Sequence, residues 1–293
     1  MARPQMTAIL ELLKPVTWFP PMWAFGCGVV SAGPIPTGRW PAIAVGVLLA
    51  GPLVCATSQA VNDWFDRHVD AINEPQRPIP SGRMPGIWGL HIAMIWTSLS
   101  VIVAALLGTE VLIAAIAGLA LAWAYSAPPP RLKLNGWWGN AACAACYEGL
   151  AWITGAIVAA GGIVPDWRTL ALALLYSVGA HGIMTLNDFK SIEGDRQMGI
   201  GSLPVRLGAA NAGLVACVFM AGSQVAVIGL LLAWGRLPHA LAIVLLLAIQ
   251  VALMKRLLAA PRERAPWYNA TGVSLYVIGM LISAFAIRPG MAG

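Results

Sequence analysis

Nine apolar stretches dominate the chain, and each is about long enough to cross a lipid bilayer as a helix. They lie near residues 15–33, 40–62, 87–107, 110–126, 139–160, 168–187, 209–233, 238–258 and 267–287. Only 10% of the 293 residues are charged, whereas soluble domains carry about 25%. The sequence therefore predicts an all-α integral membrane protein with nine transmembrane helices in a single domain, residues 1–293.

The basic residues are divided unevenly between the two sides of such a bundle. The N-terminal tail and the loops after the second, fourth, sixth and eighth stretches hold 14 of the 18 Lys and Arg residues. By the positive-inside rule, that side faces the cytoplasm, so we expect a cytoplasmic N-terminus and a periplasmic C-terminus. The net charge of +6 reflects this topology and phosphate binding. Because the basic residues are split among short loops, nucleic acid is not an expected partner.

Two acidic segments resemble each other: VNDWFDRHVDAINEPQRPIPSGR at 61–83 and LNDFKSIEGDRQMGIGSLPVRLG at 186–208. Each begins with Asn-Asp and carries a further Asp seven residues later, and the offset between them is 125 residues. We interpret this as two pseudo-repeated four-helix units, about 15–126 and 139–258, with a ninth helix at 267–287. Two copies running in one direction would place both segments on the cytoplasmic side, facing each other across a central cavity.

The two segments hold seven of the twelve acidic residues in the chain: Asp63, Asp66, Asp70, Glu74, Asp188, Glu193 and Asp195. If the second helix continues past residue 63, the first four carboxylates fall on one face and repel one another. Mg²⁺ prefers oxygen ligands and is commonly held by one or two carboxylates together with substrate phosphates. Asn62 and Asn187 would add amide groups. The alternative is that these are solvated loops whose acids pair with nearby Arg and Lys, but two matching clusters favour a functional site.

Basic residues in and near the segments are expected to bind a diphosphate: Arg67, Arg77, Lys190 and Arg196. Lys133, after the fourth stretch, could reach the diphosphate or the carboxylate of an acceptor, although simple anchoring at the membrane surface is an equal alternative. A ligand with a lipid-soluble chain and a diphosphate head is an isoprenoid diphosphate. Metal and basic residues would stabilise the departing diphosphate, and an apolar cavity would exclude water from the allylic carbocation.

The pattern N-D-x-x-D-x-x-x-D at 62–70, followed by RPIPSG, resembles the UbiA-type intramembrane prenyltransferases over essentially the whole chain. Within that superfamily, YSAPPPRLKLNGWWGN at 125–140 and NDFKSIEGDRQMGIGSLPV at 187–205 are most similar to the chlorophyll and bacteriochlorophyll synthases. The resemblance implies transfer of a geranylgeranyl or phytyl group from its diphosphate to the propionate of (bacterio)chlorophyllide. It further implies a bacterial inner (cytoplasmic or intracytoplasmic) membrane, active-site loops in the cytoplasm and pigment-assembly proteins as possible partners.

The same resemblance implies which residues bind metal. Asn62, Asp63, Asp66 and Asp70 would hold one Mg²⁺, and Asp188 with Asp195 the other, so that the five aspartates are the expected catalytic residues. The chain departs from many relatives at Ser191, where they carry an additional Asp. We do not expect Ser191 to bind metal directly, and the sequence leaves open whether Glu193 compensates.

Two buried positions are candidates for an acceptor site. His181 could bind the central metal of a chlorin, although a hydrogen bond to a neighbouring helix is the favoured interpretation. Glu148 is an isolated carboxylate in an apolar stretch, where an unpaired acid is costly. Two other functions stay open at this point: a UbiA-type prenyltransferase with another acceptor (a lipid ether or quinone precursor), and a transporter, in which internal repeats are also common.

Overall fold

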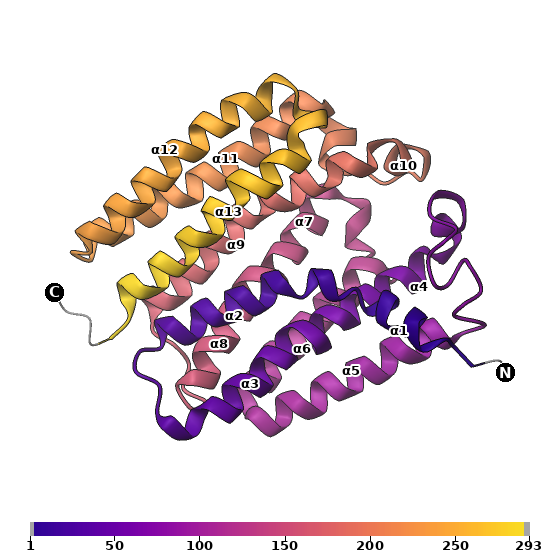
Figure 1. Ribbon diagram of the computed structural model, residues 1–293, viewed down its shortest axis with the longest axis horizontal. Helices are drawn as coiled ribbons and strands as arrows, with labels where there is room; N and C mark the ends of the chain where they lie inside the picture. The colour runs from indigo at the N-terminus through magenta and orange to yellow at the C-terminus, as the bar shows by residue number, and fades with distance from the viewer. Residues whose placement is uncertain (1–2, 290–293) are drawn as a thin grey trace.

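The chain forms a bundle of helices running along its longest axis (Figure 1), and the computed structural model describes residues 3–289. The first part comprises α1 (Met6–Leu13), η1 (Pro15–Thr17), α2 (Phe19–Ser31), η2 (Thr37–Arg39), α3 (Trp40–Leu48), η3 (Leu49–Cys55), α4 (Ala56–Asn73), α5 (Trp88–Leu107) and α6 (Thr109–Ser126). The second comprises η4 (Leu132–Leu134), α7 (Gly136–Ala144), η5 (Ala145–Leu150), α8 (Ala151–Ala159), α9 (Trp167–Asn187), η6 (Asp188–Ser191), α10 (Ile192–Gln197), α11 (Leu203–Ala233), α12 (Leu237–Ala259) and α13 (Pro261–Ile287). No strand occurs within residues 3–289, apart from one isolated bridge between Asn135 and Gly201.

Eight helices of the described chain are long and apolar enough to span a membrane. One runs from α3 through η3 into α4, another from α7 through η5 into α8, and the others are α5, α6, α9 with its extension, α11, α12 and α13. The expected first span, 15–33, contains α2, which at 13 residues is shorter than the others. An all-α multi-pass membrane protein is thus confirmed, whereas the count of nine spans stays a prediction.

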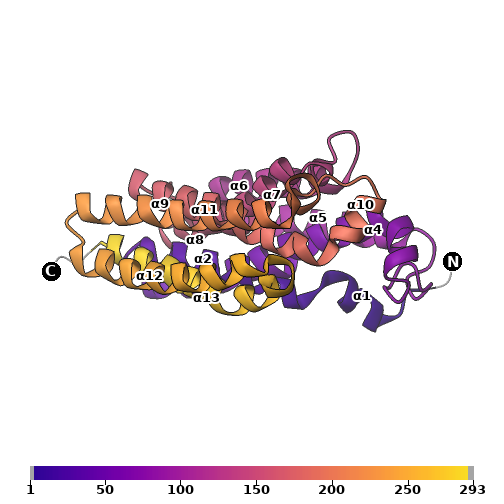
Figure 2. The ribbon, with the colours of Figure 1, turned by 90° about the horizontal axis from the view of Figure 1, so that it is seen from above.

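The long helix carrying the first acidic segment contains a π-helical section, η3, with Pro52 inside it. Proline lacks a backbone N–H and therefore disrupts the regular hydrogen-bond pattern of an α-helix. The carbonyl oxygen of Pro52 accepts a hydrogen bond from the side chain of Trp96, from Nε1 at 3.0 Å, which links this section to α5. The helix continues beyond this section as α4, which brings the first acidic segment to the end of the bundle where α1 and α10 also lie (Figure 2).

Helices α2 and α8 cross in close contact through two glycines. A Cβ atom on Gly28 would collide with the carbonyl oxygen of Trp152, and one on Gly155 would collide with the carbonyl oxygen of Phe25. Each glycine thus faces the residue three positions before the other glycine, as in the small-residue contacts of membrane helices. This reciprocal contact joins the first and the fifth apolar stretches, and the pseudo-repeat itself stays a prediction.

Helix α9, which leads into the second acidic segment, is fixed to α13 by buried tyrosines. Tyr176 and Ser283 share a hydrogen bond of 2.7 Å between their hydroxyl oxygens, and Tyr276 donates to the carbonyl oxygen of Tyr176 at 2.8 Å. Trp152 of α8 stacks on Tyr176 with 5.7 Å between ring centroids. These contacts fix the middle of α9, the helix that precedes the second segment, within the core.

Candidate functional site

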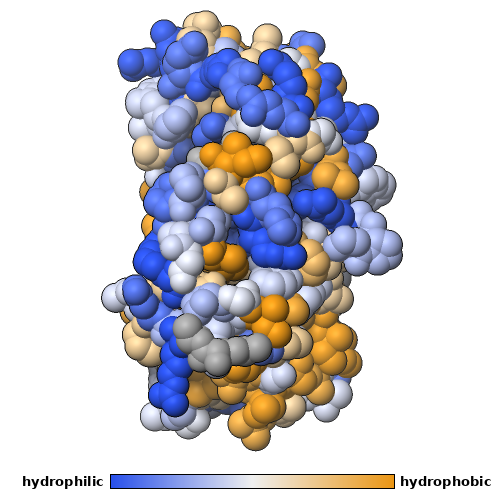
Figure 3. All heavy atoms as spheres, turned by 90° about the vertical axis from the view of Figure 1, so that its right-hand side faces the viewer, coloured by the Kyte–Doolittle hydropathy of each residue, from blue (hydrophilic) through white to orange (hydrophobic). Residues whose placement is uncertain are grey.

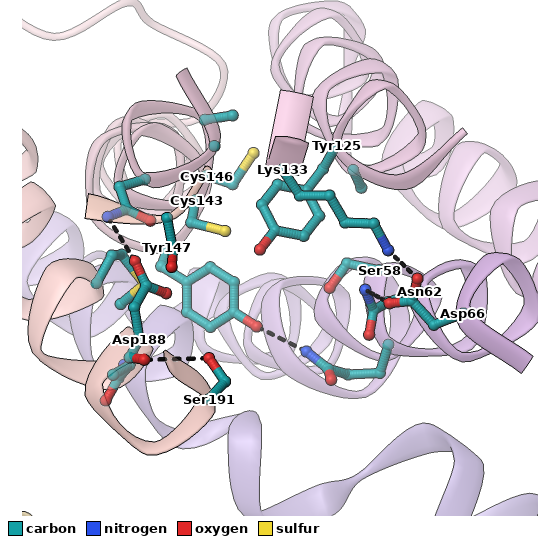
Figure 4. Close-up of a pocket in the computed structure, with 18 of the residues that line it drawn as sticks. Ser58, Asn62, Asp66, Tyr125, Lys133, Cys143, Cys146, Tyr147, Asp188 and Ser191 are labelled. Carbon is teal, nitrogen blue, oxygen red and sulfur yellow. Dashed lines mark hydrogen bonds and ion pairs between the residues drawn. The ribbon is translucent and has the colours of Figure 1, made fainter. Parts of the chain in front are cut away.

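The structure brings the two acidic segments together around one cavity of about 840 Å³. Figure 4 shows Asn62 and Asp66 on one side, Asp188 and Ser191 on the other, and the ring of Tyr147 between them. The cavity lies toward the end of the bundle that carries α1, α4 and α10, where hydrophilic residues gather on the surface (Figure 3). The lining residues from the two segments are Asn62, Asp66, Val69, Asp70, Glu74, Arg77, Asn187, Asp188, Lys190, Ser191, Gly194, Asp195, Met198, Ile200 and Ser202.

Asp66 is the carboxylate of the first segment with the most partners. Lys133 donates to its Oδ1 atom, and Asn62 Nδ2 donates to its Oδ2 atom at 3.0 Å. Arg131 Nη2 lies 3.7 Å from Oδ1. Lys133 is only 7% exposed, and burial lowers its pKa although the charge of Asp66 acts in the opposite direction. The position of Asp66 thus depends on the loop after α6.

Asp63 is placed differently from the expectation. It is 2% exposed and does not line the cavity; its Oδ1 atom accepts from Lys14 Nζ at 2.7 Å and from Arg77 Nη1 at 3.3 Å. Arg77 also donates to Asp70 Oδ2 at 2.9 Å and to Glu74. Lys14, from outside the first segment, and Arg77, from within it, therefore offset the repulsion among its carboxylates. The Oδ2 atom of Asp63 has no hydrogen-bond partner among the described residues, and a metal-binding role for this residue stays a prediction.

The second segment presents Asp188 and Asp195 to the cavity from η6 and α10. Asp188 Oδ2 accepts a hydrogen bond from Asn140 Nδ2 at 3.1 Å, and Asp195 Oδ2 accepts one from Ser191 Oγ at 2.9 Å. Ser191 thus positions a neighbouring carboxylate in this structure. Because two carboxylates with anchored oxygens face the cavity, the segment has the donors for a hard cation.

Glu193 does not line the cavity in this structure. Its side chain is 56% exposed, and its carboxylate pairs with Arg262 Nη2 at 3.0 Å and Arg196 Nη1 at 3.5 Å, so whether it takes the place of a third aspartate stays open. Asn187 lines the cavity, and its Oδ1 atom accepts from Asn269 Nδ2 of α13 at 2.9 Å. The side-chain oxygen of Asn187 is thus already engaged by α13.

The residues expected to bind diphosphate fall into two groups. Arg77, Lys133 and Lys190 line the cavity, whereas Arg67 and Arg196 do not. The guanidinium of Arg67 lies 4.1 Å from the ring centroid of Trp64 and donates to the carbonyl oxygen of Trp64. The side chain of Arg196 instead pairs with Glu193, as described above. In this structure, both arginines therefore serve local contacts, and their role toward a diphosphate stays a prediction.

Sequence reasoning missed several lining residues: Lys14, Gln59, Tyr125, Asn140 and Tyr147. Tyr147 accepts hydrogen bonds from Gln59 Nε2 at 2.9 Å and from Cys55 Sγ at 3.4 Å, which fixes its ring in the cavity. Lys14 lies before the first apolar stretch and belongs to neither acidic segment. An aromatic or amide side chain inside an apolar stretch offers no charge pattern that would have indicated these positions.

Neither candidate for the acceptor site lines the cavity. His181 Nε2 is 3.2 Å from the carbonyl oxygen of Trp137, and its ring stacks on Phe219 with 4.5 Å between centroids. The favoured interpretation, a hydrogen bond to a neighbouring helix, is confirmed. Glu148 is 5% exposed, and its Oε2 atom has no hydrogen-bond partner among residues 3–289. A role for either residue toward an acceptor stays a prediction.

The donor set fits Mg²⁺ bound together with a diphosphate. Asp66, Asp70, Asp188 and Asp195 all line the cavity, with the amide groups of the two asparagines beside them. In the described part of the chain, no three His, Cys, Asp or Glu side chains converge into a complete metal site of their own. Mg²⁺ usually takes one or two carboxylates and completes its shell with water and substrate phosphate.

Comparison with known proteins decides the family, because the model of the UbiA prenyltransferase family matches residues 17–285. The chain belongs to the UbiA prenyltransferase family. It is therefore a prenyltransferase and not a transporter. It is 55% identical to the bacteriochlorophyll synthase 33 kDa chain of Cereibacter sphaeroides over 97% of this chain and 94% of that one.

More distant members of the UbiA prenyltransferase family extend the comparison. The chain is 37% identical to the chloroplastic chlorophyll synthase of Arabidopsis thaliana, covering 94% of this chain and 73% of that protein. A solved UbiA homologue from Archaeoglobus fulgidus, bound to GPP and Mg²⁺, superposes with a TM-score of 0.73 at 19% identity and covers 96% of this chain and 99% of its own. At that identity, the likeness shows the fold alone.

Proposed function

We propose that the chain transfers a geranylgeranyl or phytyl group from its diphosphate to the propionate carboxylate of (bacterio)chlorophyllide. The observation that carries this proposal is that two acidic segments, 125 residues apart, line a single cavity in a UbiA prenyltransferase. The bacteriochlorophyll and chlorophyll synthases among its relatives support the choice of acceptor. A lipid ether or quinone precursor is the alternative acceptor.

In this proposal, Asp66 and Asp70, together with Asp63 as the resemblance implies, would hold one Mg²⁺, and Asp188 with Asp195 would hold the other, with Asn62 and Asn187 beside them. Mg²⁺, when bound, would neutralise charge on the diphosphate and so make it a better leaving group. Ser191, Asn140 and Asn269 hold the second set of ligands in place through the hydrogen bonds described above.

Lys133, Arg77 and Lys190 would bind the diphosphate oxygens through charge-assisted hydrogen bonds. As the C1–O bond of the donor breaks, the electron pair leaves with the diphosphate, and these cations stabilise its charge. A propionate is ionised at neutral pH, so its oxygen can form the new bond to C1 without a general base. The uncharged side chains deeper in the cavity, such as Val54 and Pro21, keep water from the reacting carbon.

The proposal includes a location. We place the protein in the inner membrane of a bacterium, with the N-terminus and the cavity facing the cytoplasm and the C-terminus facing the periplasm. The distribution of Lys and Arg supports this orientation. Its esterified product is insoluble in water, which makes the lipid bilayer and pigment-assembly proteins the expected recipients. Fusion of alkaline phosphatase to the C-terminus checks the orientation, since only a periplasmic C-terminus yields phosphatase activity.

A pigment-esterification assay tests the reaction. Membranes containing the full chain are incubated with geranylgeranyl diphosphate, Mg²⁺ and bacteriochlorophyllide, and the extracted pigments are separated by chromatography. Parallel reactions contain geranylgeranylglyceryl phosphate or 4-hydroxybenzoate as the acceptor, and membranes without the protein serve as the control. We expect esterified pigment alone; prenylation of another acceptor, with none of the chlorin, would contradict the proposal.

A further inference from the structure

The deep end of the cavity adjoins a second, apolar hollow of about 40 Å³. Pro21, Ala50, Val54, Gly118 and Cys146 line both spaces. The rest of the second hollow is lined by uncharged residues from four elements: Leu49, Ala114, Ala115, Leu150, Ala151 and Thr154. The two spaces therefore share part of their walls, with the carboxylates around the first and only uncharged side chains around the second.

Gly118, in the middle of α6, lies at the junction of the two hollows. A Cβ atom on this residue would lie 3.7 Å from Val54 Cγ1 and 3.8 Å from Leu150 Cδ1, which are ordinary van der Waals distances. Helix packing excludes any side chain at Gly28, but it does not require a glycine at position 118. A larger side chain on residue 118 would instead extend into the space shared by the two hollows.

Two π-helical sections form the walls of the junction opposite α6. Ala50 and Val54 belong to η3, and Cys146 and Leu150 belong to η5. Sections of this kind are frequent at functional sites, where they displace side chains from the regular helical positions. The Sγ atom of Cys146 lies 3.6 Å from the carbonyl oxygen of Gly118, so η5 and α6 contact each other directly at the junction.

The length of the combined space suits a polyprenyl chain. Asn62 at the polar end and Ala50 at the junction are 12 residues apart, which corresponds to about 18 Å along a helix. An extended chain of four isoprene units covers a comparable distance. Shorter donors with two isoprene units would end before the junction, so that only a long chain would have to pass residue 118.

We propose that Gly118 determines the length of the prenyl chain that the enzyme accepts. Its missing side chain leaves room for the terminal isoprene unit of a long donor to pass from the cavity toward the second hollow. This inference rests on the proposed function, since it assigns the donor of that reaction to these two adjoining spaces. Residue 118 does not touch the reacting atoms and acts on specificity alone.

The test compares donors of different length in the Gly118→Ala and Gly118→Leu variants. Geranyl, farnesyl and geranylgeranyl diphosphate are supplied with bacteriochlorophyllide, and kcat/KM is measured for each. We expect Gly118→Leu to lower kcat/KM for the geranylgeranyl donor about tenfold or more, in line with the cost of added bulk in an apolar pocket, while the geranyl donor changes little. Gly118→Ala should show a smaller shift in the same direction.

Gly222→Leu in α11 is the matched control, because a Cβ atom on Gly222 meets nothing within 4 Å and the residue is exposed. This variant should keep the donor profile of the unmodified enzyme. An equal loss of kcat/KM for all three donors in Gly118→Leu would overturn the inference, as would an unchanged rate with the geranylgeranyl donor.

A binding measurement separates this inference from the reaction itself. Membranes are treated with a maleimide in the presence of Mg²⁺ and either donor, and modification of Cys146 is quantified by mass spectrometry. Geranylgeranyl diphosphate should protect Cys146 in the unmodified protein, and geranyl diphosphate should not. The same protection by both donors, or by neither, contradicts the inference whatever acceptor the enzyme uses.

Discussion

The ammonium group of Lys14 lies 2.7 Å from the carboxylate of Asp63, joining the segment after α1 to the first acidic motif in α4. Asp63 is buried, and its only other cationic partner is Arg77 at 3.3 Å among the described ion pairs. The contact therefore places a positive charge directly beside a carboxylate that is only 2% exposed.

Replacement of Lys14 by Met should destabilise the protein. We expect a loss of about 1–3 kcal/mol, less than the 3–5 kcal/mol typical of a broken buried ion pair, because Arg77 still faces Asp63. Thermal unfolding in detergent measures the effect. Lys14→Arg keeps the charge and serves as the control; equal unfolding temperatures for Lys14→Met and the unmodified protein would show that the ion pair contributes nothing.

Asp66→Asn and Asp188→Asn should abolish most of the pigment esterification. Each substitution removes one negative charge from the cavity, and we expect turnover to fall at least about 100-fold, as for the loss of one electrostatic contact in a transition state. The assay is the chromatographic one described above, with thermal unfolding as the check on folding. Retained turnover in a folded variant would remove that carboxylate from the chemistry.

The close crossing of α2 and α8 predicts which glycine-to-alanine substitutions destabilise the protein. Gly28→Ala and Gly155→Ala each force a methyl group against backbone atoms of the other helix, so we expect a destabilisation of about 1–3 kcal/mol. Gly26→Ala in the same helix is the matched control, because a Cβ atom there meets nothing within 4 Å. Equal thermal stability of all three variants would disprove the tight crossing.

The docking of α1 should depend on pH through Glu11. Hydrogen bonds from Arg83, at 2.6 and 3.0 Å, lower the pKa of Glu11 below its usual value. Since this pKa is lower in the folded than in the unfolded protein, the ion pair contributes stability above the unfolded-state pKa and loses it as the pH falls through the lowered value. Amide exchange in Met6–Leu13 of α1, corrected for intrinsic rates, should therefore rise in strongly acidic buffer.

The variant Glu11→Gln completes that experiment. Without the charge, its exchange in α1 should already be faster at neutral pH and should differ little from the unmodified protein in acid. If the variant and the unmodified protein exchange alike at neutral pH, the ion pair with Arg83 does not hold α1 in place.

Much of the fold could be predicted because apolar length is a local property of the sequence. The 125-residue offset between the acidic segments likewise indicated that Asp66 and Asp188 would face one cavity. The direction of Asp63 could not be predicted, since it depends on Lys14, which is 49 residues away and belongs to no motif. Arg67 illustrates the same limit. Its position in the motif predicted a contact with the diphosphate, but in the structure its guanidinium lies over the ring of Trp64.

The sequence predicts the two π-helical sections only in part. Pro52 indicates a disturbance in its helix, but nothing in the residues 145–150 indicates a second one. Tyr147 and Cys146 both belong to the second section and line the cavity. Side chains of a long apolar helix can be assigned to a face only while its turns remain regular.

The hydrogen bond from Asn269 to Asn187 and the ion pair between Arg262 and Glu193 attach the second acidic segment to the last helix of the chain. Asn187 and Asn269 are 82 residues apart in the sequence. The second acidic segment therefore reaches this geometry only once α13 has packed beside it, so a change in the packing of α13 would be felt at the cavity.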